Sequence, residues 1–233
     1  MKRFYLSLVC FAIALTSFGQ ISPFLEKGQS GFGVGAGLEK GQHFDGFSAK
    51  AGVSLNGVFD IEVNYFRDQI DQQLEEITLL KDDATGSYTE ILLTWWLLRS
   101  KASDFIDVNF GLSPGFEFAG YDGYEYNIGS QRMEYKGYYG GELGVSSNVV
   151  FNLEKNWRLM PFYLLFYEVG LDKGEANADE SKTNYHGFTS SLGVTLSKRL
   201  EKGNSVYFSF RQTSDTYSPG GFYNVEIGYI LPW

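Results

Sequence analysis

The stretch that decides the fold is the last one, Gly221-Phe-Tyr-Asn-Val-Glu-Ile-Gly-Tyr-Ile-Leu-Pro-Trp233. Counted back from Trp233, every second residue is apolar or aromatic, whereas the positions between them include Asn224, Glu226 and Gly228. A β-strand turns successive side chains to opposite faces, so this stretch would have one wholly apolar face. Such a face meets a core in a soluble sheet, but it meets lipid in a membrane-spanning barrel, whose polar side chains point inward.

The beginning of the chain predicts export. The basic pair Lys2 and Arg3 precedes an apolar run over residues 4–16, and small residues follow that run. This is the pattern of a secretory signal peptide, and it is too short for a membrane-spanning helix. We therefore predict a signal peptide at 1–19 and a single outer-membrane barrel domain at 20–233.

The composition narrows the classes of function. The only cysteine, Cys10, lies within the predicted signal peptide. The exported chain would therefore have no disulfide, no thiolate metal site and no cysteine nucleophile. The formal net charge of −9 argues against nucleic acid as a partner, because that partner is itself strongly negative.

Nine earlier segments alternate in the same way, although two of them carry apolar residues on both faces. The segments lie at about 31–38, 46–55, 59–65, 87–98, 106–118, 132–151, 157–170, 185–198 and 205–212. Four joins are short, among them the hairpin signal Asn56-Gly57, and the others are mostly longer and polar. Bacterial barrels have even strand numbers, short inner turns and longer outer loops. We predict an all-β fold, a transmembrane antiparallel up-and-down β-barrel of ten strands. Eight is the alternative if the glycine-rich first hairpin lies outside the wall.

The same register places outward aromatic side chains at two levels, where interfacial girdles are expected. At the outer level it predicts Tyr65, Phe118, Tyr135, Tyr167 and Tyr223. At the inner level it predicts Phe59, Trp95, Phe151, Trp157 and Trp233.

A terminal aromatic preceded by alternating apolar residues resembles the C-terminal signal of bacterial outer-membrane β-barrels. The exported chain as a whole is similar to small barrels of the OmpA/OmpX-like kind, particularly the compact ones of Bacteroidota. Phe18-Gly-Gln20, Gly31-Phe-Gly-Val-Gly-Ala-Gly37 and Lys50-Ala-Gly-Val-Ser54 carry that similarity. The resemblance implies outer-membrane lipid, lipopolysaccharide and the barrel-assembly machinery as partners. The implied assembly signal comprises Trp233, Leu231, Tyr229 and Ile227.

The register also places charged side chains inside the barrel. The inward charges are Lys50, Asp60, Glu62, Glu90, Asp107, Glu117, Glu134, Lys136, Glu142, Arg158, Glu168, Arg211 and Glu226. Eight-stranded barrels are filled by side chains and sixteen-stranded ones leave a channel, so ten strands lie near the filled limit. We favour a hydrogen-bonded plug, because buried charges must be paired. The alternative is a narrow path for cations along an acidic wall.

The external loops are expected to be acidic, which fits a solvated surface or weak Ca²⁺ or Mg²⁺ binding. The acids are Asp68, Asp71, Glu75, Glu76, Asp82 and Asp83 in the second loop, and Asp172, Glu175, Asp179 and Glu180 in the fourth. The fourth loop lacks the spacing of an EF-hand, so we expect no metal site and no cofactor.

Enzymatic activity finds little support in the pattern. His43 and His186 lie toward the outer end, where some barrels carry hydrolytic sites, but neither belongs to a recognisable catalytic motif. Gly33-Val-Gly-Ala-Gly37 lacks the following helix that a dinucleotide site needs.

The expected function is therefore non-enzymatic. We expect a structural or accessory barrel that presents its loops to an unknown membrane or extracellular protein. A narrow cation-preferring pore is the alternative, and an outer-rim hydrolase is a distant one.

Overall fold

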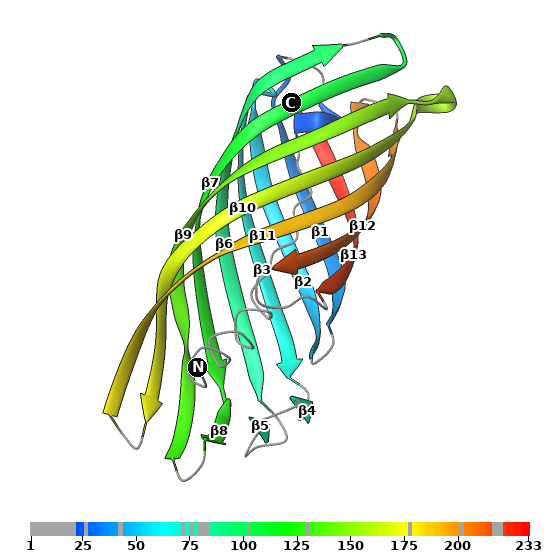
Figure 1. Cartoon of the computed structure of the whole chain (residues 1–233). Coiled ribbons are helices and arrows are strands. Elements are labelled where there is room, and N and C mark those ends of the chain that lie inside the picture. Colours follow the sequence, from blue (N-terminus) through cyan, green and yellow to red (C-terminus); the bar gives the residue numbers. More distant parts are fainter. Residues whose placement is uncertain are drawn as a thin grey trace.

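The computed structural model describes residues 22–25, 28–41, 44–70, 73–74, 77–78, 84–101, 103–128, 131–176, 179–200, 203–215 and 221–233. These residues form a closed antiparallel barrel (Figure 1). The predicted signal peptide at 1–19, His43 and the loop acids Asp71, Glu75, Glu76, Asp82 and Asp83 lie outside the described residues.

Ten strands make the wall, as predicted. They are β1 Gly31–Gly41, β2 Phe44–Leu55, β3 Phe59–Ile70, β6 Thr85–Lys101, β7 Ile106–Asp122, β9 Gln131–Asn152, β10 Trp157–Ala176, β11 Asp179–Arg199, β12 Ser205–Asp215 and β13 Phe222–Pro232. Each strand pairs with its neighbours along the chain, and β1 closes the barrel on β13 from Gly31↔Pro232 to Gly41↔Phe222. The glycine-rich first strand is thus part of the wall, and the eight-stranded alternative is wrong.

The remaining elements are short. Strands β4 Gln73–Leu74 and β5 Ile77–Thr78 pair with each other, and β8 Glu125–Ile128 pairs with β9. Two 3₁₀ turns, η1 Ser22–Phe24 and η2 Glu154–Asn156, complete the described elements. No helix among the described residues has the length and apolar character that crossing a membrane requires.

The wall is much taller on one side than on the other. We call the end of the barrel near Trp233 the inner end and the opposite end the outer end. Strands β6, β7, β9, β10 and β11 are 17 to 22 residues long, whereas the other five wall strands have 11 or 12 residues. The five long strands are neighbours in the sheet. About 9–11 tilted residues cross a bilayer. At the outer end, β9, β10 and β11 pair with one another beyond the ends of β7 and β12, and we call this part the projecting wall.

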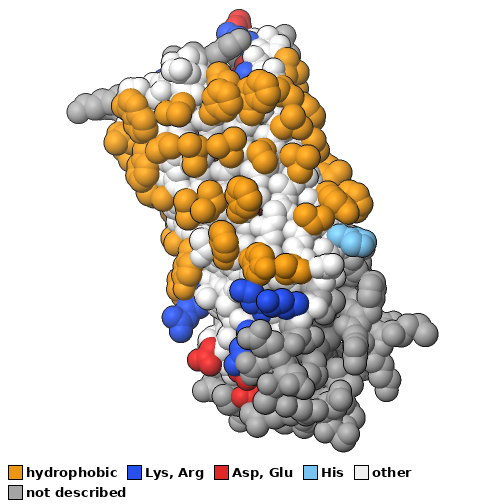
Figure 2. All heavy atoms as spheres, turned by 90° about the vertical axis from the view of Figure 1, so that its left-hand side faces the viewer, with side chains coloured by type: hydrophobic (Ala, Val, Ile, Leu, Met, Phe, Trp, Pro, Cys, Tyr) orange, Lys and Arg blue, Asp and Glu red, His pale blue; other side chains and the backbone are white. Residues whose placement is uncertain are grey.

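An apolar band surrounds the barrel. Outward side chains such as Leu143, Leu192 and Ile227 are 60%, 64% and 66% exposed. Figure 2 shows hydrophobic side chains covering one continuous zone, with charged side chains at its borders. This is the outward face that the alternation predicts, and it is inverted relative to a soluble sheet.

A β-bulge in β9 corrects the predicted register. Pairing with β10 skips one residue between Gly137 and Tyr135, and Gly137 has a φ of 141°. The extra residue reverses which side chains point inward in the part of β9 between the bulge and the outer end. Tyr135 is therefore buried, not in the outer girdle, and Lys136 is exposed. The prediction that Glu134 and Lys136 belong to the luminal charges is wrong: they pair with each other, and their side chains are 30% and 42% exposed.

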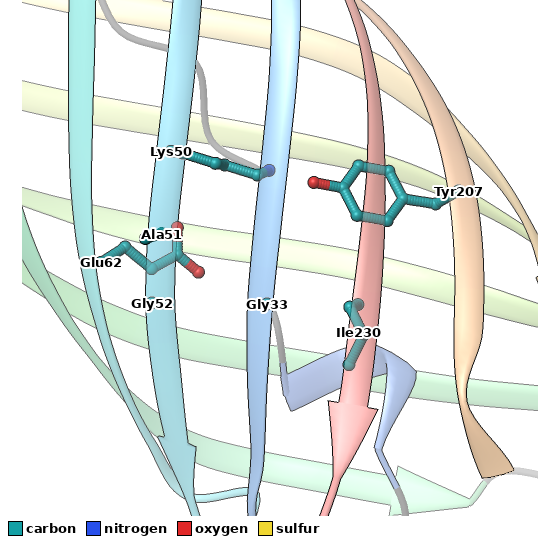
Figure 3. Close-up of a pocket in the computed structure, with 7 residues that line it drawn as sticks. All are labelled: Gly33, Lys50, Ala51, Gly52, Glu62, Tyr207 and Ile230. Carbon is teal, nitrogen blue, oxygen red and sulfur yellow. The ribbon is translucent and has the colours of Figure 1, made fainter. Parts of the chain in front are cut away.

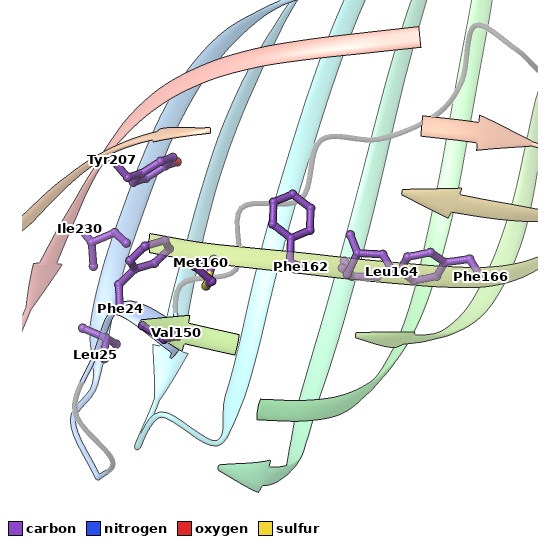
Figure 4. Packing of buried hydrophobic residues seen from close by; sticks show 10 residues of the cluster. Phe24, Leu25, Val150, Met160, Phe162, Leu164, Phe166, Tyr207 and Ile230 are labelled. Carbon is purple, nitrogen blue, oxygen red and sulfur yellow. The ribbon is translucent and has the colours of Figure 1, made fainter. Parts of the chain in front are cut away.

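The interior near the inner end is apolar. Residues 22–25 lie inside the barrel there, and we call them the inner plug. Phe24 stacks on Tyr207, with ring centroids 5.5 Å apart. Figure 4 shows Phe24 and Leu25 beside inward side chains of the wall, including Met160 and Ile230.

Candidate functional site

The interior of the barrel holds most of the predicted site residues. At the inner end, two half-buried arginines hold the inner plug. Arg158 donates to the carbonyl oxygen of Phe24 at 2.8 Å, and Arg99 donates to that of Leu25 at 2.9 Å. Asp107 is half-buried and accepts a hydrogen bond from Asn152 at 2.9 Å. Sequence reasoning missed Arg99, because it was assigned to a turn.

Between the plug and the solvent at the inner end lies a pocket of about 360 Å³. Its lining includes Leu25, Arg99, Asp107, Asn109 and Arg158. Asn109 is buried at the far side of this lining and donates to Asn148 at 2.7 Å. The pocket is therefore a recess of the inner end that ends against packed side chains.

A buried ion pair occupies the middle of the barrel. Lys50 Nζ lies 2.5 Å from Glu226 Oε1, and the hydroxyl of Tyr207 donates to the same oxygen at 2.6 Å. Figure 3 shows Lys50 on β2 and Tyr207 on β12 reaching toward each other across β1 and β13, with Glu62 nearby. The cavity that they line with Glu62 has a volume of only about 10 Å³, no more than one water molecule needs. Asp60 lies closer to the inner end than Glu62 and accepts a hydrogen bond from Trp96 Nε1 at 3.0 Å.

Toward the outer end, Glu90, Glu117 and Glu142 meet; we call them the carboxylate cluster. One oxygen of each lies within 4.8 Å of the others, and all three side chains are buried. Glu168 lies directly opposite Glu142 on the neighbouring strand and is 1% exposed. Four predicted luminal acids thus gather at one level of the barrel.

Arg211 is fully buried on the opposite side of the lumen. Its Nη2 lies 3.7 Å from Glu39 Oε1, and Asn224 donates to the same oxygen of Glu39 at 2.9 Å. Sequence reasoning missed Glu39, because the preceding inward positions of β1 are all glycine. A strict period of two from those glycines would have found it.

Two acids assigned to external loops are also inside the barrel. Asp68 in β3 and Asp172 in β10 are 2% and 5% exposed. Glu175, Asp179 and Glu180 likewise fall within strands β10 and β11. These loop assignments are wrong, because the strands continue beyond the apolar band. There, water on both faces removes the requirement for an apolar outward side.

The C-terminal residues lie as the alternation predicts. Trp233, Leu231 and Ile227 are 63%, 44% and 66% exposed, and Tyr229 is half-buried. The backbone N–H of Trp233 donates to Ser30 at 3.0 Å, so the terminal residue is tied to the start of β1. The role of these four residues in assembly stays a prediction.

His186 is exposed on the outer surface, with its ring centroid 6.5 Å from that of Tyr167. It points away from the luminal carboxylates, as the register predicts.

No known family model matches this chain. No curated protein matches it in sequence either. Among solved structures, the outer-membrane protease OmpT of Escherichia coli is similar at 9% identity and a TM-score of 0.46, over 88% of this chain and 94% of that one. The translocator domain of the autotransporter NalP of Neisseria meningitidis is similar at 11% identity and a TM-score of 0.47, over 88% of this chain and 89% of that one. An outer-membrane channel of Pseudomonas putida F1 is similar at 10% identity and a TM-score of 0.43, over 94% of this chain and 100% of that one. No activity is carried over at this distance.

The closed wall and its outward apolar band decide where the protein lies. Closure leaves no open sheet edge within the band, and the band presents apolar side chains to its surroundings. A barrel with these two properties spans a lipid bilayer. The chain is a small β-barrel protein of the bacterial outer membrane.

Proposed function

We propose that this outer-membrane barrel is a closed, non-conducting one, of the OmpA/OmpX-like kind, that acts by presenting its outer rim to another protein. The observation that carries the proposal is the filled interior. From the inner end outward, Met160, Leu92 and Leu164 are buried inside the barrel, followed by Tyr138 and Tyr124. Large side chains buried at several levels of the lumen narrow any path that an ion would have to take.

The polar side chains inside the barrel support the same interpretation. Inward hydroxyl groups bond one another across strands. Ser113 bonds both Thr94, at 3.0 Å, and Ser146, at 2.7 Å, and Thr195 bonds Ser209 at 2.9 Å. Hydroxyls that pair in this way form a cross-braced interior, whereas a conducting path would keep them hydrated.

The projecting wall supports the interaction role. Toward the outer end, the pairing between β11 and β12 stops at Thr189↔Asp215. The pairing between β10 and β11 continues ten residues further along β11, to Ala176↔Asp179. A wall of this height is more than a barrel needs to cross the membrane. It therefore places an ordered sheet surface outside the bilayer, where a soluble or membrane partner could bind it.

Conductance of the purified protein in planar bilayers tests the closed state. We expect no steady conductance from preparations whose folding is verified by heat-modifiable migration on gels. The acidic interior favours cations if ions do pass. Stable, cation-selective channels from the wild-type protein would refute the proposal and establish the narrow pore in its place.

A further inference from the structure

The carboxylate cluster places like charges side by side without an evident cation. Glu90 on β6 lies directly opposite Glu117 on β7, and Glu142 on β9 lies opposite Gly115, two residues along β7 from Glu117. Like charges opposite each other destabilise a sheet, and burial increases the penalty. The fold therefore brings three acids together at a site where only an added positive charge would stabilise them.

Hydrogen bonds satisfy only part of this cluster. Asn64 donates to Glu90 Oε2 at 2.7 Å, and Tyr138 donates to Glu117 Oε2 at 2.8 Å. Within the described part of the chain, Glu90 Oε1, Glu117 Oε1 and both oxygens of Glu142 are buried without a hydrogen-bond donor. Four buried acceptor oxygens of the cluster thus lack a well-formed hydrogen bond from a described donor.

The hydroxyl of Tyr88 is a separate indication of a ligand. Tyr88 is 2% exposed, and its hydroxyl group lies beside the carboxylate of Glu117 without a well-formed hydrogen bond to it. Its electrostatic neighbours are Glu117, Glu90 and Glu142. A buried hydroxyl normally has a well-formed hydrogen bond, and this oxygen lies where a cation bound by the cluster would find a further ligand.

Of the two buried cations of the described lumen, Lys50 is engaged elsewhere, whereas Arg211 is shared between Glu39 and the electrostatic field of Glu90. Lys50 pairs with Glu226 at 2.5 Å, and Arg211 has its ion pair with Glu39. Three acids therefore face one shared arginine, and bound protons or a bound metal cation would neutralise the remaining negative charge.

We propose that the carboxylate cluster is a site for one calcium ion, with Tyr88 as a neutral oxygen donor beside it. All available donors are oxygen, which selects hard cations. Calcium takes six to eight oxygens at about 2.3–2.6 Å, so oxygens on opposite sides of the ion lie roughly 4.6–5.2 Å apart. The three oxygens of the cluster lie within 4.8 Å of one another, close enough for one such ion to contact all of them. Magnesium would need a tighter octahedron, at about 2.0–2.1 Å.

The location of the site suggests what the ion does. Glu90, Glu117 and Glu142 come from the neighbouring strands β6, β7 and β9, of which β9 continues into the projecting wall. One ion bound to all three would link those strands where the wall leaves the apolar band. Calcium would then hold the wall in a single arrangement, which goes beyond the proposed role of the wall as a presented surface.

Terbium luminescence tests the site directly, because Tb³⁺ replaces Ca²⁺ and is excited by nearby tyrosine. The refolded protein in detergent is titrated with Tb³⁺ after treatment with EDTA and then back-titrated with Ca²⁺. We expect one Tb³⁺ site in the wild type, displaced by Ca²⁺, and an affinity at least about tenfold weaker in Glu142→Gln, because charge count sets affinity in such sites. Glu62→Gln is the matched control: Glu62 is also luminal and buried, but it lies outside the cluster.

Stability provides the second measurement. The urea concentration at the midpoint of unfolding should be higher in calcium than in EDTA for the wild type and for Glu62→Gln. For Glu142→Gln the two midpoints should be the same. If Glu142→Gln does not refold, Glu117→Gln takes its place. An unchanged Tb³⁺ signal in the cluster variants would assign the binding to surface acids and refute the proposal. A wild type with no Tb³⁺ or Ca²⁺ response would also refute it and leave protons as the neutralising species. Neither result depends on whether the barrel conducts.

Discussion

At the scale of single residues, close packing inside the barrel explains several of the glycines. An added Cβ at Gly228 would overlap the hydroxyl end of the Tyr207 ring, and one at Gly35 would lie 2.5 Å from the Tyr207 hydroxyl oxygen. The missing side chains thus leave the space in which Tyr207 reaches Glu226 and Lys50. The glycine string of β1 accommodates an aromatic side chain and has no part in binding a nucleotide.

We predict that Gly228→Ala destabilises the barrel by ~1–3 kcal/mol, because the ring of Tyr207 must leave its bond to Glu226 to relieve the overlap. Gly120→Ala is the control, since its added Cβ would meet only Ser87 Oγ at an ordinary 3.7 Å. Urea unfolding in lipid vesicles measures both variants. Equal midpoints for the two would contradict the packing explanation.

At the scale of elements, the strands are governed by two different environments. Within the apolar band, each strand must turn apolar residues to lipid, so alternation is strong and the sequence reveals it. Beyond the band, β10 and β11 continue to pair through Lys173↔Lys182 and Glu175↔Glu180, positions that alternation alone would assign to a loop. Backbone pairing sustains these strand ends where hydrophobic patterning no longer indicates them.

We predict that Leu192→Arg, on β11, destabilises the barrel by ~2–4 kcal/mol if the residue lies near the middle of the bilayer. Leu192 is 64% exposed on the outward face, so a charge there must enter lipid. Leu192→Phe keeps the position apolar and should change the unfolding free energy little. The two are compared by urea unfolding in lipid vesicles. Similar losses from both would mean that this face packs against protein.

At the scale of the whole molecule, the barrel combines a filled interior with a one-sided outer wall. The inner plug is held by Arg99 and Arg158, and buried side chains fill the levels above it. The neighbouring strands β9, β10 and β11 then continue together on one side. The asymmetry gives the barrel a sheet surface beyond the apolar band.

Assembly of the whole barrel should depend on Trp233. We predict that deleting it lowers the outer-membrane level of the protein and increases its degradation in the periplasm. The residue anchors the inner interface, where amphipathic aromatic side chains are preferred, and it joins the end of β13 to Ser30. Trp233→Phe should retain most of the assembled protein. Heat-modifiable barrel in membrane fractions is the measurement, and wild-type levels after deletion would exclude this dependence.

The sequence by itself determined the membrane barrel, its ten strands and the inward direction of most luminal charges. A period of two and the contrast between lipid and lumen are local properties, so they can be read residue by residue. Lys50, Glu62, Glu90 and Glu226 all point inward as predicted.

Only the tertiary structure decided which of these charges meet. Strand pairing brings Glu90, Glu117 and Glu142 together although 52 positions separate the first from the last. The bulge at Gly137 turned Tyr135 inward and Lys136 outward, because one unpaired residue reverses every side chain beyond it. Strand register and bulges depend on the neighbouring strand, so the grouping of the luminal charges required the folded barrel.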